Sequence, residues 1–354
     1  MKMTSRWFLL RTCVAAMALA SPIAACSSTP SGPSTTSAEV GATHYAKTCA
    51  LCHGAHGEGY AADNATALNN AEFLTTASDD FLRRSIARGR PGTTMSAWDR
   101  LHGGPHDEDA IVAIAAYVRT WQKEPSVTLS EARINGDASR GAATYAARCA
   151  SCHGATGTEG PNVHLGNAEF LAVASDAFLE RAILRGRPGT TMQGYQGKLQ
   201  FAEVADLVAL LRSWAKPVAT GDVPIPGTLG PIIAHPDGPE PAFVVGNRYT
   251  SADAIKAELD RGAAFGFLDA RPPSDYVTSH IAGAASVPFY EAKDYLFALP
   301  KDKWLVSYCG CPHAESGQLA DALLSNGFTK VTVLDEGFYV WKDRGYPVRT
   351  GAVP

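Results

Sequence analysis

The sequence predicts a multidomain chain in which two all-α domains are followed by an α/β domain with a parallel sheet. The chain has 354 residues, a length that corresponds to two or three domains at ~100 to 200 residues each. Residues 40–121 and 138–215 repeat one another, and each copy ends in an apolar-periodic helix. After residue 242, strands alternate with helices, which is typical of a parallel sheet.

Composition excludes several classes of protein. Hydrophobic residues make up 45% and charged residues 19%, with a formal net charge of −4, so the chain is neither disordered nor a polybasic nucleic-acid binder. The only long apolar run lies within the first 25 residues, so no transmembrane bundle is expected. The cysteines occur mostly in closely spaced pairs, unlike a disulfide framework, at positions 13, 26, 49, 52, 149, 152, 309 and 311.

The N-terminus has the features of an export signal. An apolar stretch at residues 13–20 follows three basic residues, namely Lys2, Arg6 and Arg11. The segment Ile23-Ala24-Ala25-Cys26 resembles a bacterial lipobox, which implies cleavage before Cys26 and attachment of acyl chains that hold the protein on a membrane. The alternative is ordinary cleavage with Cys26 left as a free thiol. Removal of residues 1–25 would change the net charge from −4 to −7.

Low-complexity segments predict the domain boundaries. Residues 27–37 are only Ser, Thr, Pro and Gly, and residues 217–241 hold seven prolines and four glycines, compositions that are typical of linkers. The expected parts are a signal peptide (1–25), a spacer (26–38), a first domain (39–123), a linker (124–136), a second domain (137–216), a linker (217–241) and a third domain (242–354).

The internal repeat consists of two matching blocks. The first block ends in Cys49-Ala-Leu-Cys52-His53 and recurs 100 residues later as Cys149-Ala-Ser-Cys152-His153. The second block, Arg88-Gly-Arg-Pro-Gly-Thr-Thr-Met95, recurs 97 residues later and ends in Met192. Two copies are too few for a solenoid, and about 80 residues alone form a marginal core that a large cofactor would help to fill.

Each copy contains a Cys-x-x-Cys-His motif, which indicates c-type haem attachment in an exported protein. Two thiols at this spacing bond to the two vinyl groups of one haem, and the adjacent histidine, His53 or His153, is placed on the iron. A single motif could also be a redox dithiol or half of a zinc site. The duplication of the motif makes both of these alternatives less favoured. The sequence therefore predicts two covalently bound haem c groups, attached through Cys49, Cys52, Cys149 and Cys152.

The two methionines that follow the signal are candidates for the sixth iron ligand. Met95 and Met192 occupy the same position of the repeat, a coincidence that a role in core packing does not predict. A His/Met pair raises the reduction potential and suits electron transfer rather than substrate binding. Other histidines have no equivalent in both copies and are assigned to surface or loop roles: His56, His102, His106 and His164.

Both copies resemble class I cytochromes c, over residues 40–121 and 138–215. The resemblance implies that the helix bearing Gly41, or Gly141 in the second copy, crosses the terminal helix of its own domain at close range. In that family a proline usually follows the ligand methionine, whereas Ser96 and Gln193 follow it here. Dihaem thiosulfate dehydrogenases are similar but use an axial cysteine, and these domains have no cysteine beyond the attachment pairs.

The third domain places a cysteine at a site that parallel sheets use for ligands. The expected elements are a helix at 251–261, strands at 265–268 and 304–308, a helix at 315–325 and a strand at 331–334. Cys309 directly follows a strand and precedes a helix, at the carboxyl end of the sheet. Backbone N–H groups and the positive end of that helix are expected to lower the pKa of its thiol and make it a nucleophile.

Residues 242–354 resemble the rhodanese family. The matching residues are Asp269-Ala-Arg271, Tyr276, His280-Ile-x-Gly-Ala284, Val287-Pro288, Tyr308-Cys309, Leu334-x-x-Gly337 and Trp341. The resemblance implies that Cys309 accepts a sulfane sulfur as a persulfide, cradled by the amides of residues 310–315, with Arg271 among the site residues. The loop is one residue longer than in the family and ends in Glu315, which is expected to repel a thiosulfate dianion and to disfavour thiosulfate-to-cyanide transfer.

Two further residues of this loop allow other chemistry. Cys311 could resolve a Cys309 persulfide or form an easily reduced disulfide with it, and His313 could stabilise either thiolate. The Cys-x-Cys-x-His cluster could instead hold a soft metal such as copper, or the domain could be a non-catalytic binding module.

The sequence therefore predicts a periplasm-facing, membrane-anchored lipoprotein of the bacterial cell envelope. It would exchange electrons with redox partner proteins of the respiratory chain and handle a small sulfur-containing substrate or thiol redox chemistry through Cys309. The alternative is an electron shuttle whose last domain only binds a partner or a metal.

Overall fold

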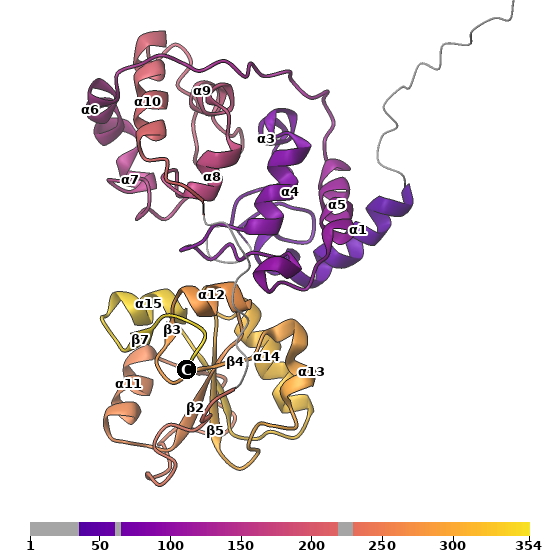
Figure 1. Ribbon diagram of the computed structural model, residues 1–354, viewed down its shortest axis with the longest axis vertical. Coiled ribbons are helices and arrows are strands. Elements are labelled where there is room, and N and C mark those ends of the chain that lie inside the picture. The colour runs from indigo at the N-terminus through magenta and orange to yellow at the C-terminus, as the bar shows by residue number, and fades with distance from the viewer. Residues whose placement is uncertain (1–34, 61–64, 219–228) are drawn as a thin grey trace, which may run out of the picture. The chain divides into compact units, whose positions relative to one another are not determined.

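The computed structural model describes residues 35–60, 65–218 and 229–354, and residues 35–354 form one compact unit (Figure 1). The expected signal peptide and Cys26 lie outside these residues. Helix α1 begins at Thr35, so the expected spacer ends a few residues earlier than position 38. Within the described segments, no helix combines the length and the apolar character that a membrane span requires.

The first repeat folds as short helices joined by loops. Side-chain oxygens start several of them, since Asn70 accepts a hydrogen bond from Phe73 N, Ser78 from Phe81 N and Asp107 from Ala110 N. Its elements are α1 (Thr35–Thr48), α2 (Ala50–His53), α3 (Ala71–Thr76), α4 (Asp79–Arg88), the 3₁₀ helix η1 (Arg100–His102) and α5 (Glu108–Arg119).

The close helix crossing that the repeat predicted is present in both domains. A Cβ atom added to Gly41 would lie 1.9 Å from Ala113 O on α5, and one added to Gly141 would lie 2.2 Å from Asp206 O. The helices of the second domain are α6 (Ala138–Arg148), α7 (Ala150–His153), α8 (Ala168–Val173), α9 (Asp176–Arg185) and α10 (Phe201–Ser213). A side chain larger than hydrogen would force these helices apart.

The two helical domains meet through equivalent residues. The ring centroids of Phe81 and Phe178, which occupy the same repeat position, lie 4.9 Å apart. Arg90 lies over the Phe170 ring at 5.7 Å, and its counterpart Arg187 lies over Phe73 at 5.9 Å. The interface is therefore quasi-two-fold, as the isologous interface of a homodimer would be.

Side-chain amides add a reciprocal pair of hydrogen bonds to this interface. Asn70 Nδ2 donates to Pro188 O at 2.8 Å, and Asn167 Nδ2 donates to Pro91 O at 3.0 Å. Ion pairs join Arg88 to Glu169 and Arg181 to Glu72 across the same interface. The sequence analysis identified the repeat but not this pairing.

The third domain is a layered α/β unit, as predicted. A parallel sheet has the strand order β1-β6-β5-β2-β4, and β3 pairs with β7 in a separate antiparallel ribbon. The strands are β1 (Tyr249–Thr250), β2 (Phe265–Asp269), β3 (His280–Ile281), β4 (Ala285–Ser286), β5 (Trp304–Tyr308), β6 (Val331–Leu334) and β7 (Val348–Arg349). The helices are α11 (Ala252–Asp260), α12 (Pro273–Thr278), η2 (Phe289–Glu291), α13 (Ala292–Tyr295), α14 (Ala314–Ser325) and α15 (Gly337–Asp343).

Two apolar cores lie on opposite faces of this sheet. Helices α11 and α15 cover one face and α13 and α14 the other (Figure 1). Neighbouring residues of one strand alternate between the cores, as Phe267 and Leu268 do in β2. The end of the expected 217–241 linker is part of this packing, because Ala234 N donates to Phe265 O at 2.9 Å.

Candidate functional site

The first Cys-x-x-Cys-His motif forms the short helix α2. The Cys49 and His53 side chains are buried, and His53 Nδ1 donates to Thr66 O at 2.9 Å. This bond leaves Nε2 as the ring nitrogen available to iron. Burial also lowers the pKa of His53, which keeps the imidazole in the neutral form that binds a metal.

The second motif has the same geometry on α7. His153 Nδ1 donates to Val163 O at 2.9 Å, and burial lowers the pKa of His153 as well. The Tyr45 and Tyr145 hydroxyls donate to Gly54 O and Gly154 O at 2.8 Å each. The two cysteines, the histidine and the tyrosine that hydrogen-bonds to the following glycine therefore have the same arrangement in both domains.

The loops that end in Met95 and Met192 also share the same pattern of hydrogen bonds. Arg90 N donates to Met95 O at 2.7 Å, and Arg187 N donates to Met192 O at 2.8 Å. In both loops a glycine with positive φ makes the turn, and a Cβ atom on Gly89 would lie 2.5 Å from Met95 O. Two thiols, an imidazole with a free nitrogen and a thioether make a donor set that fits haem c.

The third domain brings two thiols together at the carboxyl end of β5. Cys309 Sγ lies 3.8 Å from Cys311 Sγ and 3.2 Å from Ser316 Oγ, and it donates to Cys311 O at 2.6 Å. Both cysteines are buried, with exposed fractions of 1% and 3%. The predicted position of Cys309, between a central strand and helix α14, is confirmed.

Comparisons with known proteins match these three units. Residues 36–118 and 136–211 match the family of cytochrome c oxidase, cbb3-type, subunit III. Residues 251–344 match the rhodanese-like domain family. The chain joins two cytochrome c domains to a rhodanese-like domain.

Individual relatives match part of the chain. A thiosulfate sulfurtransferase GlpE of Pseudomonas fluorescens is 37% identical over 23% of this chain and 74% of its own length. The HTH-type transcriptional regulator Rv0324 of Mycobacterium tuberculosis is 35% identical over 28% of this chain, and the match spans only 46% of that regulator. The solved Alr3790 protein from Anabaena sp. is 30% identical, with 29% of this chain and 92% of that chain covered and a TM-score of 0.28.

The pKa prediction for Cys309 is wrong. Burial, together with the neighbouring Cys311, raises the pKa of the Cys309 thiol well above its ordinary value, although Ser316 acts in the opposite direction. The expected decrease in pKa came from the position of Cys309 before α14, whereas the burial of the thiol could not be seen in the sequence. Cys309 is therefore a thiol rather than a thiolate in this closed arrangement.

Glu315 acts differently from the repelling anion that the sequence suggested. Its side chain is buried, and burial, aided by nearby Cys309 and Asp275, raises its pKa well above the ordinary range. Burial likewise raises the pKa of Asp275. Glu315 is thus a neutral carboxylic acid, and it still supplies no positive charge to hold thiosulfate.

Arg271 does not serve as a free anion ligand. Its guanidinium donates to Asp269 through Nε at 2.9 Å and through a terminal nitrogen at 2.6 Å, and it also donates to Ser279 O at 2.7 Å. It lies over the Phe338 ring at 4.1 Å and is 3% exposed. Arg271 therefore stabilises the carboxyl edge of the sheet and neutralises a buried aspartate.

His313 does not contact the thiols either. Its Nε2 lies 2.8 Å from Asp335 Oδ1, and its ring packs on Tyr249 with centroids 4.0 Å apart. Among the described residues, no cluster of three or more His, Cys, Asp or Glu side chains is arranged to hold a metal ion. The predicted Cys-x-Cys-x-His site is consequently not assembled.

Of the other histidines, His56, His106 and His164 occupy loops and His102 ends the 3₁₀ helix η1. His106, however, is not a surface residue. It is 4% exposed, and its Nε2 lies 3.0 Å from Thr48 Oγ1. His102 pairs with Asp99 at 2.5 Å. His106 thereby ties the loop before α5 to the end of α1, directly before the first haem motif.

Sequence reasoning missed the residues through which the first cytochrome domain covers the rhodanese-like loop. Tyr339 OH donates to Thr93 O at 2.6 Å, and Tyr290 OH donates to Gly103 O at 2.6 Å. Ser96, which stands where the cytochrome family usually has proline, is buried and its side chain interacts with Asp275. That departure from the family pattern was the one available signal.

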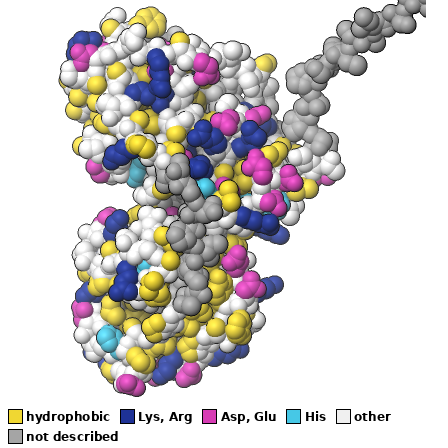
Figure 2. Space-filling model, in the orientation of Figure 1, with side chains coloured by type: hydrophobic (Ala, Val, Ile, Leu, Met, Phe, Trp, Pro, Cys, Tyr) yellow, Lys and Arg dark blue, Asp and Glu magenta, His cyan; other side chains and the backbone are white. Residues whose placement is uncertain are grey.

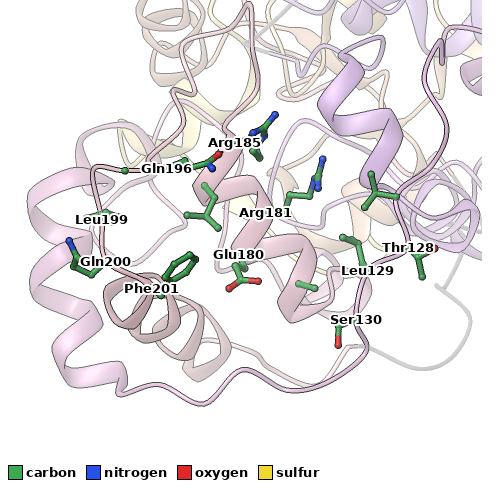
Figure 3. A pocket seen from close by; sticks show the side chains of 14 residues that line it. Thr128, Leu129, Ser130, Glu180, Arg181, Arg185, Gln196, Leu199, Gln200 and Phe201 are labelled. Atoms are coloured by element: carbon green, nitrogen blue, oxygen red, sulfur yellow. Dashed lines mark hydrogen bonds between the residues drawn. The ribbon is translucent and has the colours of Figure 1, made fainter.

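One hollow of the surface lies apart from the haem motifs and the thiol pair. It measures about 760 Å³ and is lined by α9, the loop before α10 and residues 127–130 (Figure 3). None of the predicted site residues lines it. On the face drawn in Figure 2, basic and acidic side chains are interspersed and form no single basic patch.

Proposed function

We propose that this protein is a dihaem c-type electron carrier whose rhodanese-like domain feeds it electrons from a sulfur or thiol reaction at Cys309 and Cys311. The observation that carries the proposal is the pair of thiols 3.8 Å apart at the end of β5, in a domain that shares a chain with two cytochrome c domains. Bound haem c supplies one-electron exchange. The protein residues supply the thiols, orient them and exclude water.

The thiol arrangement favours redox chemistry over transfer of sulfur from thiosulfate to cyanide. Arg271 is already paired with Asp269, and the neutral Glu315 offers no charge for a dianion. Two neighbouring thiols can instead be oxidised to a disulfide, with two electrons passing to an acceptor such as bound haem c. Alternatively, one thiol can take a sulfane sulfur from a donor as a persulfide, which the second thiol resolves to a disulfide with release of sulfide. A small neutral or monoanionic sulfur species is therefore the substrate class that we propose.

A cavity next to this edge of the sheet is large enough for such a substrate. It measures about 830 Å³, and Tyr290 and Ser286 of the rhodanese-like domain line it together with Gly103 of the first cytochrome domain. Ser286 Oγ is buried and has no hydrogen-bond partner in the described structure. Because Ser286 ends β4, this hydroxyl lies at the same edge of the sheet as Cys309.

The proposal includes the cell envelope as the place of action. The signal at residues 1–25 and the lipobox cysteine Cys26 support a lipid-anchored protein that faces the periplasm. Electrons would then pass to redox partner proteins of the respiratory chain. The mildly acidic net charge of the mature chain would steer it toward basic partner surfaces.

A second candidate function is a pure electron shuttle with a non-catalytic rhodanese-like module. The observation in its favour is that burial raises the pKa of Cys309. The hydrogen bond with Cys309 lowers the pKa of Cys311, but the hydrogen bond with Cys52 and burial outweigh it and raise the pKa of Cys311 above its usual range. A thiol held in this form reacts slowly as a nucleophile. The two candidates differ in whether Cys309 changes chemically during haem reduction.

One experiment on the mature full-length protein separates the candidates. The protein is incubated with sulfide, polysulfide or thiosulfate, and its intact mass and haem absorbance are recorded together. We expect two haems, acyl groups on Cys26, a persulfide or disulfide at Cys309, and haem reduction that falls about tenfold or more in Cys309→Ser because the reacting thiol is lost.

The companion variant Cys311→Ser shows which sulfur chemistry occurs. A persulfide that persists on Cys309 in this variant would indicate sulfane transfer, and its absence would indicate a dithiol reaction. Equal haem reduction rates in wild type and Cys309→Ser, with an unmodified Cys309, would refute the proposed coupling and leave the shuttle.

A further inference from the structure

The haem motif of the first cytochrome domain lies directly against the thiol pair of the rhodanese-like domain. Helix α2 contacts α14, and Cys52 packs on the apolar core that contains Cys309 and Cys311. The side chains of Cys52 and Cys311 interact with each other. Cys52 is one of the two residues that would carry a haem thioether.

The loop that supplies the candidate ligand Met95 also lies next to the rhodanese-like domain, close to the segment that carries the thiols. Tyr339 OH donates to Thr93 O at 2.6 Å. A Cβ atom on Gly310, between the two cysteines, would lie 3.6 Å from Thr94 Cγ2. The loop that carries Met95 therefore lies next to Gly310, the residue between the two cysteines.

Equivalent residues of the second cytochrome domain have a different environment. Cys152, the counterpart of Cys52, is exposed, and Thr191, the counterpart of Thr94, is exposed as well. Gln193 is exposed where Ser96 of the first domain is buried. Both domains therefore have the candidate haem site, but only the first has the contact with the thiol-bearing loop.

From this juxtaposition we propose that the first cytochrome domain, and not the second, is the redox partner of a Cys309–Cys311 dithiol, with Cys311 and Cys52 as the point of electron passage. This inference rests on the proposed function and names the partner within it. Electron transfer weakens steeply with distance, so direct contact selects the first domain. The second domain then relays electrons onward.

The reaction balances with the oxidant that the chain itself carries. Cys309 and Cys311 lose two protons and two electrons as one S–S bond forms between their sulfur atoms. Bound haem c at the two Cys-x-x-Cys-His sites would supply the one-electron acceptors for these two electrons, and the protons pass to solvent. The Sγ atoms are 3.8 Å apart, so they must approach to the ~2 Å of a disulfide, a movement that side-chain rotation within one loop supplies.

The test compares one substitution at two equivalent positions of the full-length holoprotein. Thr94→Lys places a charged side chain against Gly310, whereas Thr191→Lys places it at the exposed counterpart. The anaerobically reduced protein receives a ferricyanide pulse that oxidises the haems, and their re-reduction by the thiols is followed by absorbance. In parallel, alkylation of Cys309 and Cys311 by iodoacetamide is measured by mass spectrometry.

We expect Thr94→Lys to slow re-reduction about tenfold or more and to speed alkylation by a similar factor, because alkylation of a buried thiol waits for local opening. Thr191→Lys should match wild type in both measurements. Cys311→Ser should abolish re-reduction while the haem spectra stay unchanged.

Each failure has its own meaning. Equal effects of Thr94→Lys and Thr191→Lys would overturn the assignment to the first domain but leave thiol-to-haem coupling in place. Absence of re-reduction in the wild type, with intact thiols, would overturn the coupling itself.

Discussion

The two cytochrome domains have the same internal geometry and different surroundings. His53 and His153 are held by backbone carbonyls at the same distance of 2.9 Å, and the loops ending in Met95 and Met192 share their hydrogen bonds. Around these sites the rhodanese-like domain covers the first copy, whereas the 124–136 segment packs on the second. Repetition therefore fixes the geometry inside each domain, whereas the segments packed around it differ between the two.

One ion pair shows this difference most clearly. Arg119 in the first domain and Arg212 in the second bind an aspartate and two backbone carbonyls in the same way. The aspartates differ, because the Asp79 side chain is 75% exposed and that of Asp176 is 2% exposed. Ile134 N and Arg133 of the linker cover Asp176.

The largest expected effect follows from this ion pair. Asp176→Asn should destabilise the protein by about 3 kcal/mol or more, because it breaks an ion pair whose aspartate side chain is only 2% exposed and leaves one of the donors, Arg212 or Ile134 N, without its acceptor. Asp79→Asn is the matched control and should cost less than about 1 kcal/mol. Urea unfolding with hydrogen exchange resolved for α5 and α10 checks both values, and equal losses would contradict the burial argument.

A smaller effect is expected at the helix crossings, where the domains should behave alike. Gly41→Ala and Gly141→Ala should each destabilise their own domain by about 2 kcal/mol, because the added methyl group overlaps a backbone carbonyl. Ala46→Ser, at an exposed position of α1, is the control. Thermal unfolding of the holoprotein measures the loss, and a Gly41→Ala protein as stable as wild type would refute the close crossing.

The smallest effect is a pH dependence confined to the first domain. Burial lowers the pKa of His106 to about 4 from an ordinary 6.5. Between these values the unfolded chain binds a proton that the folded domain excludes, so stability falls as pH falls below 6.5, by about 1 kcal/mol over the first pH unit. Leu199 occupies the equivalent bridge position of the second domain and does not titrate.

The variant His106→Gln tests this assignment, since glutamine retains a hydrogen bond to Thr48 without titrating near these pH values. Unfolding curves of α5 between pH 4 and 7 should become flatter in the variant, and those of α10 should not change. A wild-type slope that persists in His106→Gln would place the titrating group elsewhere.

Much of the fold could be predicted because it is encoded locally. Strand β5 begins and ends at the predicted residues, since a short apolar run bounded by polar residues is a strong signal. The crossing at Gly41 followed from the cytochrome resemblance, and the three-domain order from the repeat and the strand-helix alternation. The strand depends on residues near one another in the sequence, whereas the crossing joins Gly41 to Ala113 of α5 and could be predicted only through the resemblance.

The electrostatics of the thiol site could not be predicted, because they depend on residues far away in the sequence. Cys309 was expected to ionise readily from its place before α14, but it is 1% exposed in a core that also includes Leu268 of β2 and Val333 of β6, and burial raises its pKa. Arg271 was expected in the site and is instead paired with Asp269. A motif identifies the reactive atom, whereas the depth of burial comes from packing that no motif records.

The reciprocal amides of Asn70 and Asn167 have a consequence for how such a chain evolves. Each asparagine caps a helix of its own domain through Oδ1 and reaches the ligand loop of the other through Nδ2. A single copy cut out of the gene would lose the acceptor for its amide and expose Phe81 or Phe178 to water. The tandem, and not the repeat, is therefore the smallest part that recombination can transplant intact.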